Sequence, residues 1–176
     1  MVVDNMRDPL ITSPYRRTLL QQALSRFPDL DISAIDASAI LEIAAQKVRA
    51  LIFAPLSEQG ISQARYWVLM CLSLEEQLGN EPPSPSVIAD CLNVTRATMT
   101  QLLDGLEHEG LVERRPVGND RRAQAIHLTE DGRTLFERLV PPVAAQVAHV
   151  FAPLTLAERQ TLIELLSKLA AQDAAR

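Results

Sequence analysis

The chain has 176 residues, of which 47% are hydrophobic, so it can bury one sizeable core as a single domain or as two small lobes. Its formal net charge of -5 argues, taken alone, against nucleic-acid binding. No apolar run approaches the roughly 18 residues that cross a bilayer, and the segment Met1–Leu10 lacks the apolar stretch of a signal peptide. The two cysteines, Cys71 and Cys91, lie in segments with helical patterning, which argues against a disulfide framework. We therefore expect a cytoplasmic protein with no membrane partner.

Two helices are expected in the N-terminal third of the chain. Arg16–Phe27 forms a short one, and a longer one opens at a capping box of Ser33 and Asp36 and ends near Pro55. The apolar stripe of the longer helix consists of Ile40, Ile43, Ala44, Val48, Leu51 and Ile52. This stripe predicts that one face of the helix is buried against another surface.

The middle of the chain carries two further helices with clear start signals. The first lies between Gly60 and Gly79. Its residues expected to face inward are Tyr66, Leu69, Leu72 and Leu78. The second is the short segment Pro85–Leu92, for which Ser84 is a suitable N-cap and proline suits the first helical position.

A tight turn and a hairpin complete this region. The turn at Asn93-Val94 leads into a helix that Thr95 caps and that runs to about His108. Two extended segments follow, Leu111–Val117 and Gln124–Leu128, with a turn between them. The order of helix, short helix, tight turn, helix and hairpin is that of a winged helix-turn-helix.

The C-terminal part is expected to form two helices with wide apolar faces. The first begins after Thr129 and bends at Pro141-Pro142. The second opens at a capping box of Thr155 and Glu158. The apolar stripes of the two helices are Leu135, Phe136, Leu139, Val143, Val147 and Val150, and then Leu162, Leu165, Leu166 and Leu169.

The expected fold class is mainly α with a small β-hairpin wing, a winged helix-turn-helix flanked by N- and C-terminal dimerisation helices. Residues 1–60 would form the N-terminal extension and first dimerisation helix, 61–133 the DNA-binding lobe, and 134–176 the C-terminal dimerisation helices. Within the lobe, the recognition helix is 95–108 and the wing is 111–128. The apolar stripes at the two ends need a further surface to bury them, and large exposed apolar patches usually mark an interface, here that of a homodimer.

The recognition helix has one apolar and one polar face. Ala97, Thr98 and Gln101 lie in the N-terminal half of the polar face, the part that reads base edges in a major groove. Arg96 can reach a phosphate. In the hairpin, an arginine of the Asp120–Arg122 run can enter a minor groove. The predicted contacts to double-stranded DNA are made by Thr95, Arg96, Ala97, Thr98, Gln101, Arg115, Asp120, Arg121 and Arg122.

Acidic residues weaken any argument from charge in this region. The local arginines are offset by Asp90, Asp104, Glu107, Glu109 and Glu113. The ordered combination of elements therefore carries the prediction of DNA binding, and a basic patch does not.

Four runs of residues resemble the MarR family of bacterial transcriptional regulators. They are Pro85–Glu107, Gly110–Arg115, the wing run Asn119–Arg122 and the following Leu128–Gly132. The wing with Asp-Arg-Arg followed by Leu-Thr-Glu-Asp-Gly is the most specific of them. The likeness covers roughly residues 33–170 and is densest over 84–133.

The resemblance implies an obligate homodimer whose two winged lobes read the halves of a palindrome. By position, Ala97, Thr98 and Gln101 correspond to the family's major-groove residues and Arg122 to its minor-groove residue. Many members are repressors that small aromatic or phenolic ligands release from DNA. The run Leu139–Pro142 is similar to the family's multidrug-efflux repressors.

Other residues leave alternatives open. Tyr66, Trp67 and Met70 either line a pocket for an aromatic ligand or belong to the core. Cys71 is expected to be a packed thiol, and a redox role for Cys91 would need a lowered pKa. No metal-ligand spacing, catalytic triad or phosphate-binding loop is present, so we expect no cofactor and no enzyme activity. The competing functions are a winged-helix protein–protein interaction module and a thiol-based redox-sensing regulator.

Overall fold

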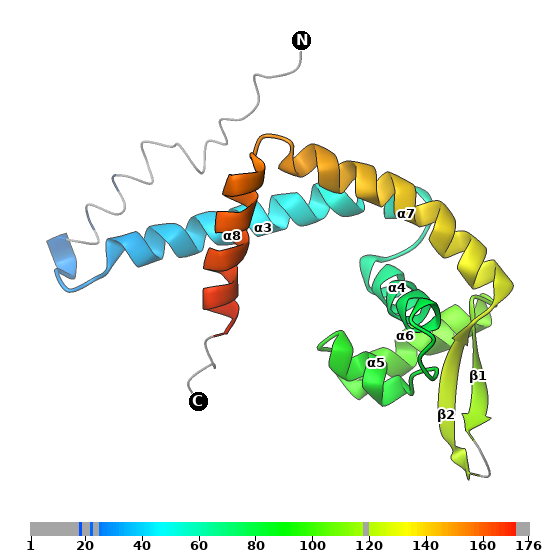
Figure 1. The fold of residues 1–176 in the computed structure, drawn as a ribbon. Coiled ribbons are helices and arrows are strands. Elements are labelled where there is room, and N and C mark those ends of the chain that lie inside the picture. Colours follow the sequence, from blue (N-terminus) through cyan, green and yellow to red (C-terminus); the bar gives the residue numbers. More distant parts are fainter. Residues whose placement is uncertain (1–17, 19–21, 23–24, 118–119, 172–176) are drawn as a thin grey trace. The chain divides into compact units, whose positions relative to one another are not determined.

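The computed structural model describes residues 18, 22, 25–117 and 120–171, and it consists of two compact units, residues 1–50 and 51–176. The helix predicted at Arg16–Phe27 lies largely outside the described residues. The described elements, in chain order, are α3 (Ile32–Glu58), α4 (Gln63–Gln77), α5 (Pro85–Cys91), α6 (Arg96–His108), β1 (Val112–Val117), β2 (Asp120–Leu128), α7 (Glu130–Phe151) and α8 (Leu156–Ala170) (Figure 1). The prediction of a mainly helical fold with one β-hairpin is confirmed.

Helix α3 differs from its prediction at both ends. The carboxylate of Asp31 accepts hydrogen bonds from the Ala34 backbone N–H at 3.1 Å and the Ser33 hydroxyl at 2.6 Å, so the first turn is capped by Asp31 and not by Ser33 with Asp36. The helix also continues through Pro55 to Glu58. Proline removes one helical hydrogen bond, but the next residue, Leu56, is 1% exposed in the core, and its burial favours continuing the helix.

Helix α4 lies at the centre of the second unit. Ser62 caps it by accepting a hydrogen bond from the Arg65 backbone N–H, and its buried residues are Tyr66, Val68, Leu69, Cys71, Leu72 and Ser73. The prediction that Leu78 faces inward is wrong, because its side chain is 64% exposed. The helix ends at Gln77, and Gly79, with φ +68, turns the chain out of the helical path before Leu78 can join the buried face.

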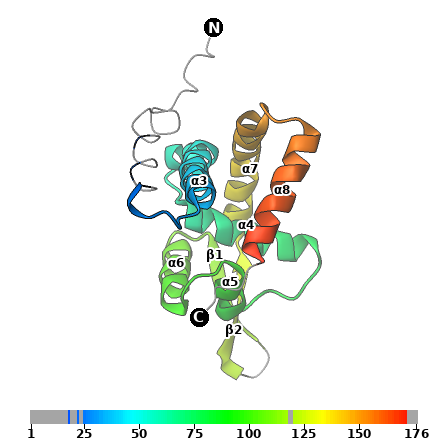
Figure 2. The same ribbon diagram turned by 90° about the vertical axis from the view of Figure 1, so that its left-hand side faces the viewer.

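The core of this unit joins α4 to the end of α3, to α5, α6, both strands and α7. Its largest fully buried side chains are Leu56, Val68, Leu69, Leu72, Ile88, Met99, Leu103, Leu106, Ile126 and Leu139. Every fold element of the winged lobe thus contributes to one continuous core, as a lobe of this size requires. Figure 2 shows α4, α5 and α6 grouped together, with the hairpin extending past them.

The hairpin is antiparallel and longer than predicted. Val112 pairs with Leu128 and Pro116 with Gln124, and the register shifts between Pro116 and Val117. Strand β2 begins at Asp120 rather than Gln124. The four added residues include two arginines and lack an apolar alternation, which is why periodicity gave no sign of them.

Helices α7 and α8 follow their predicted starts. Helix α7 begins after Thr129 and is continuous through Pro141 and Pro142, and Figure 1 shows it curved along its length. The capping box of Thr155 and Glu158 is confirmed at the start of α8, where each residue bonds the other's backbone N–H. No residue of α8 is buried.

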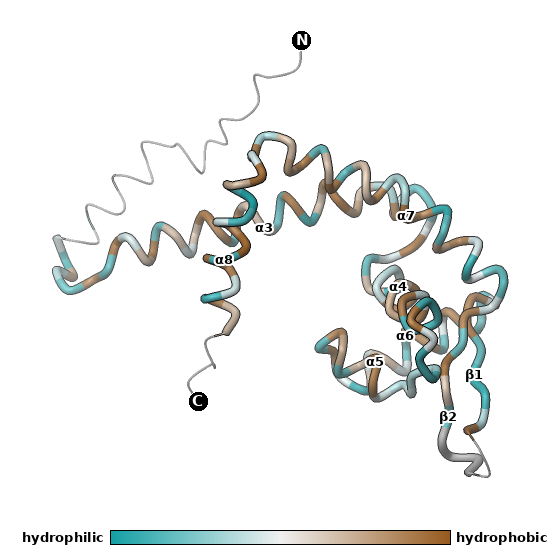
Figure 3. The backbone as a smooth tube through the Cα atoms, in the orientation of Figure 1, coloured by the Kyte–Doolittle hydropathy of each residue, from teal (hydrophilic) through white to brown (hydrophobic). Residues whose placement is uncertain are grey.

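Apolar residues recur along both α3 and α8 (Figure 3). In α3 only Leu56 is buried, and the most exposed apolar residues of α8 are Leu156, Ile163, Leu165 and Leu169. In the part of the chain that the structure describes, no single helix is both long and apolar enough to cross a membrane. The pair α7 and α8 meets that test by length and composition only when combined across a bend of 97°.

Candidate nucleic-acid interface

The helix-turn-helix is built from local signals at three positions. Ser84 caps α5 by accepting a hydrogen bond from the Val87 backbone N–H, and Thr95 caps α6 by accepting one from the Thr98 backbone N–H at 3.1 Å. Between the two helices, Asn93 has φ 50, a left-handed conformation that asparagine tolerates better than most residues. The turn is therefore short, and α5 packs directly against α6.

Helix α6 separates a buried face from an exposed one, as predicted. Met99, Leu103 and Leu106 are at most 1% exposed. The predicted DNA-contacting residues of the helix, Arg96, Ala97, Thr98 and Gln101, are all exposed, as is the cap Thr95. The two threonine hydroxyls, of Thr95 and Thr98, bond each other at 2.8 Å. In the described part of the chain, the side chains of Arg96 and Gln101 make no hydrogen bond or ion pair.

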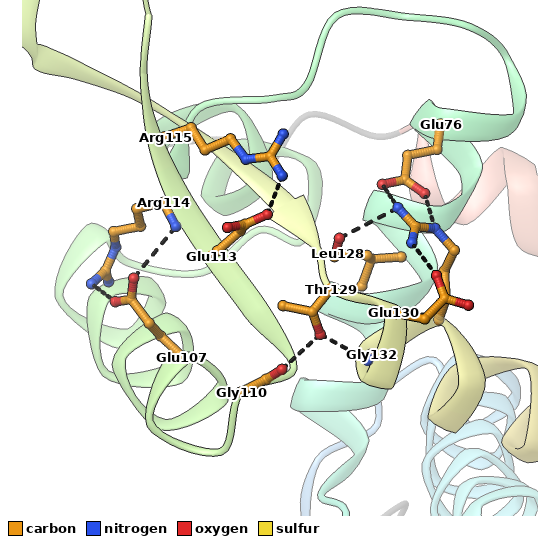
Figure 4. Close-up of polar contacts among 11 residues, drawn as sticks. Glu76, Glu107, Gly110, Glu113, Arg114, Arg115, Leu128, Thr129, Glu130 and Gly132 are labelled. Atoms are coloured by element: carbon orange, nitrogen blue, oxygen red, sulfur yellow. Dashed lines mark hydrogen bonds and ion pairs between the residues drawn. The ribbon is translucent and has the colours of Figure 1, made fainter.

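The acidic residues of α6 are held by arginines from neighbouring elements. Arg114 of β1 lies 2.5 Å from Asp104 Oδ1. It also lies 2.5 Å from Glu107 Oε2, and its backbone N–H donates to Glu107 (Figure 4). Arg65 of α4 donates to Glu109 at 2.7 Å. Asp104, Glu107 and Glu109 therefore each have an arginine partner within the lobe.

The structure describes the side chain of one predicted wing residue, Arg115. The guanidinium of Arg115 pairs with Glu113 on the same strand, and its side chain is 58% exposed (Figure 4). The backbone of Asp120, Arg121 and Arg122 lies in β2, but their side chains are outside the described residues. The hairpin thus carries these residues at the end farthest from α7, where the strand pairing with Val117 begins.

The junction between the hairpin and α7 is closely fitted. Thr129 accepts a hydrogen bond from the Gly132 backbone N–H at 3.0 Å and donates one to the Gly110 carbonyl at 2.6 Å (Figure 4). A Cβ on Gly132 would lie 2.0 Å from the Leu111 carbonyl oxygen, so only glycine fits. The Leu-Thr-Glu-Asp-Gly run is thereby explained as a helix cap followed by a close backbone approach.

Arg133 ties this junction to α4 and was missed by sequence reasoning. Its guanidinium bonds both carboxylate oxygens of Glu76, at 2.9 and 3.1 Å, and donates to the Leu128 carbonyl. It also pairs with Glu130 at 3.1 Å, three residues earlier on the same helix. The hydrogen bond that Arg133 donates to Glu76 is the largest cause of the raised pKa of Arg133. The spacing to Glu130 could have been read from the sequence, but the partner Glu76 lies 57 residues away.

The predicted aromatic residues belong to a larger cluster. Tyr66 and Trp67 of α4 lie with ring centroids 5.7 Å apart, and Phe53 of α3 contacts both, at 6.0 and 5.5 Å. Phe136 of α7 completes the cluster, 5.7 Å from Tyr66. Tyr66 is 5% exposed, and burial raises the pKa of its hydroxyl. Met70 is half-buried and packs against the core.

The two cysteines lie near each other but in different environments. Cys71 is buried, as predicted, and burial, followed by the neighbouring Cys91 thiol, raises its pKa to about 11. Cys91 is exposed at the end of α5. Among the described residues, no group of three or more histidine, cysteine or carboxylate side chains is arranged to hold a metal ion.

Comparison with known proteins places this geometry in a family. The sequence model of the MarR family matches residues 59–123. The transcriptional repressor YetL of Bacillus subtilis is 32% identical over 113 residues, which are 63% of this chain and 65% of that protein. The transcriptional repressor MprA of Escherichia coli is 31% identical over 114 residues, 65% of this chain and 63% of that protein. The chain thus spans less than two thirds of the length of these two relatives.

Solved structures agree with the sequence matches. A variant of MarR from E. coli, complexed with operator DNA, is 28% identical and superposes with a TM-score of 0.69, over 80% of this chain and 98% of that one. The family's sequence model covers α4, α5, α6 and the hairpin up to residue 123, the same elements that form the helix-turn-helix and its wing. By sequence and by fold, this chain belongs to the MarR family.

Proposed function

We propose that the chain is a sequence-specific DNA-binding transcriptional regulator that acts as a homodimeric repressor. The observation that carries the proposal is the N-terminal half of α6, where Arg96, Ala97, Thr98 and Gln101 are exposed while the opposite face is buried. A recognition helix needs this division, because one face must pack while the other enters the major groove. Gln101 suits an adenine edge, and Arg96 suits a phosphate.

The acidic overall charge is compatible with this role. Asp104 and Glu107 lie in the C-terminal half of α6 and Glu109 is its C-cap, and each is paired with Arg114 or Arg65. The half of the helix that would face the bases carries no acidic residue from Arg96 to Leu103. The field that a phosphate backbone meets is therefore less repulsive than the net charge of -5 implies.

The names of related proteins support repression as the direction of regulation. YetL and MprA are both transcriptional repressors, and the MarR structure contains operator DNA. A repressor acts by occupying DNA that the transcription machinery needs. Sequence-specific binding by α6 and the wing is sufficient for that role, and no catalytic activity is required.

The proposed dimer rests on the terminal helices. In α8 no residue is buried, and Leu156, Ile163, Leu165 and Leu169 are each more than half exposed. In α3 Ile35, Leu41 and Leu51 are exposed as well. Apolar faces of this kind are buried in a second copy of the chain, and a two-fold axis then presents two recognition helices to two half-sites, roughly 34 Å apart.

The proposed ligand is a small aromatic compound that binds beside the aromatic cluster. Tyr66, Trp67, Phe53 and Phe136 meet there from α4, α3 and α7, and Met70 lies on the same helix as Tyr66. Aromatic rings prefer edge-to-face and offset contacts with one another, and a ligand ring beside this cluster would make contacts of the same kind. A ligand in this place would push α7 from α4 and thereby release the operator.

The DNA-binding proposal is tested by fluorescence anisotropy on a labelled duplex from the region upstream of the protein's own coding sequence. We expect saturable binding that survives an excess of unrelated duplex and weakens as salt rises, because bound phosphates release counterions. Equal binding to both duplexes would remove the claim of sequence specificity. Absence of any DNA binding, together with retention of the dimer, would favour a protein–protein interaction module instead.

A thiol-based regulator is the second alternative, and the same assay addresses it. Cys91 is exposed, while the pKa of Cys71 is raised to about 11, so Cys71 is a poor nucleophile at neutral pH. We expect Cys91→Ser to bind the operator like the wild type with or without hydrogen peroxide. Loss of binding by the wild type alone under peroxide would favour redox control.

A further inference from the structure

The recognition helix contains a glycine where helix propensity disfavours one. Gly105 lies in the interior of α6, four residues before the C-cap Glu109. Apart from proline, glycine is the least favourable residue at such a position. No turn or positive φ requires it there, since the positive-φ glycines of the described residues are Gly60, Gly79 and Gly110. The backbone conformation therefore does not explain the glycine, and the side chain packed against it does.

The guanidinium of Arg65 occupies the space that a side chain at this position would need. A Cβ on Gly105 would lie 2.4 Å from Arg65 Nη2 and 3.5 Å from its Cζ. From this seat against the backbone of α6, Arg65 Nη1 donates to Glu109 Oε1 at 2.7 Å. The Arg65 side chain is only 21% exposed, and that of Glu109 is 44% exposed. The Arg65 side chain thus extends from α4 to α6 and forms an ion pair with the C-cap residue of the recognition helix.

We propose that Arg65 is a positioning residue that fixes the recognition helix against α4, and that Gly105 provides the seat for its guanidinium. The proposal rests on the DNA-binding role proposed for α6. Arg114 holds Asp104 and Glu107 from the side of the hairpin, so α6 is fixed between arginines of two different elements. Tyr66 and Trp67 follow Arg65 on α4, so the proposal predicts that a displacement of α4 at the aromatic cluster moves α6 through this contact.

Two substitutions remove the contact from opposite sides. Arg65→Gln removes the guanidinium, and Gly105→Ala places a methyl group in the space that the guanidinium occupies. We expect each to weaken operator binding about fivefold, at the lower end of couplings between sites. Because the obstructing atom is the free end of a flexible side chain, Gly105→Ala displaces Arg65 without distorting α6, and alanine favours the helix. The melting temperature of Gly105→Ala should therefore not fall.

The double variant tests whether both changes act through one contact. The three atoms nearest to a Cβ at position 105 all belong to Arg65. Once Gln replaces Arg65, the added Cβ no longer displaces a guanidinium, so the double variant should bind the operator no more weakly than Arg65→Gln alone. Arg138→Gln serves as the control for loss of one positive charge, since Arg138 is exposed on α7 and makes no ion pair with any described residue. The control should bind the operator as the wild type does.

Trp67 supplies a readout that a purely stabilising contact would not affect. It is the only tryptophan of the chain and lies two residues after Arg65 on α4. In the wild type, saturation with operator duplex should change the Trp67 emission, because α6 and α4 are linked. In Arg65→Gln and in Gly105→Ala this change should be lost at saturating DNA.

The outcomes separate this proposal from the one on which it rests. If the wild type binds no duplex specifically, the DNA-binding role fails and the positioning role fails with it. If the wild type binds its operator but both variants keep its affinity and its Trp67 response, only the positioning role is overturned. Additive losses in the double variant would likewise overturn it, since the two residues would then act separately.

Discussion

Arg114 of β1 lies 2.5 Å from Asp104 of α6, and the same guanidinium holds Glu107 one turn further along that helix. The hairpin and the recognition helix are thus joined by a fork of charge-assisted hydrogen bonds. This relationship explains how a helix with three carboxylates near its C-terminal half can still be presented to DNA.

Arg114→Gln should weaken operator binding about tenfold at low salt, because it leaves two uncompensated carboxylates close to the phosphates. The deficit should shrink as salt rises, since the repulsion is screened. Combining it with Asp104→Asn and Glu107→Gln should restore most of the affinity in anisotropy titrations. A triple variant as weak as the single one would mean that Arg114 contacts DNA itself.

Arg122→Ala should weaken operator binding by about tenfold or more without lowering the melting temperature. Ion pairs at a protein surface contribute little to stability in general, while an arginine drawn into a minor groove contributes strongly to binding. Titrations at several salt concentrations should give a shallower salt dependence than the wild type. Wild-type affinity in Arg122→Ala would contradict the minor-groove assignment.

Gln101→Ala and Arg96→Ala should change DNA binding in different ways, the first its sequence specificity and the second its overall affinity. Loss of a base contact reduces discrimination between operator and unrelated duplex, whereas loss of a phosphate contact weakens both by a similar factor. Competition titrations with the two duplexes measure this directly. If Arg96→Ala changed base preference while Gln101→Ala did not, the two roles would have to be exchanged.

Local signals in the sequence predicted much of this arrangement. Four N-caps, a turn with Asn93 and the two faces of α6 were readable because each depends on residues within a few positions of one another. The four caps are Ser84, Thr95, Thr129 and Thr155. Even so, the cap of α3 was misplaced by two residues, because Asp31 and Ser33 are both good cap residues and only geometry chooses between them.

Contacts between distant segments were beyond prediction. No periodicity links Arg133 to Glu76 or Arg65 to Glu109, since these pairs form only when separate helices meet. The aromatic cluster shows the same limit. Tyr66 and Trp67 were identified, but Phe53 and Phe136 joined them through tertiary packing of α3 and α7 on α4.

Gly132→Ala should destabilise the protein by about 2 kcal/mol or more, because a new Cβ would meet the Leu111 carbonyl oxygen, a backbone atom that cannot move aside. Gly105→Ala is the matched control, since both glycines are helical but the atom facing Gly105 is a mobile side-chain end. Urea unfolding of the two variants should therefore move in different directions. Equal stability of the two would contradict the close fit at the hairpin–α7 junction.

The buried Cys71 thiol should make the protein less stable in alkali. Its pKa is raised to about 11 from the ordinary value of 9.0, so the unfolded chain loses this proton first as pH rises. The contribution to stability is complete below pH 9 and is lost between about 9 and 11, reaching about 1 kcal/mol of loss by pH 10. Urea unfolding of wild type and Cys71→Ala at pH 8 and 10 measures the difference. A wild type that loses no more stability than the variant would contradict the burial of this thiol.

The terminal helices should hold two copies of the chain together. Ile163 and Leu169 of α8 are 58% and 54% exposed, which is unfavourable for large apolar side chains unless another surface covers them. Replacing both with glutamate should give a monomer by light scattering at micromolar concentration, because burying two carboxylates in an apolar interface is costly. The affinity for the operator should fall when the dimer is lost, since one lobe alone contacts only one half-site. Ala157→Glu with Thr161→Glu adds the same charge to the polar side of α8 and should leave both the dimer and its operator binding intact. A monomeric wild type, or a dimer that tolerates both glutamates at positions 163 and 169, would show that α8 is not the interface.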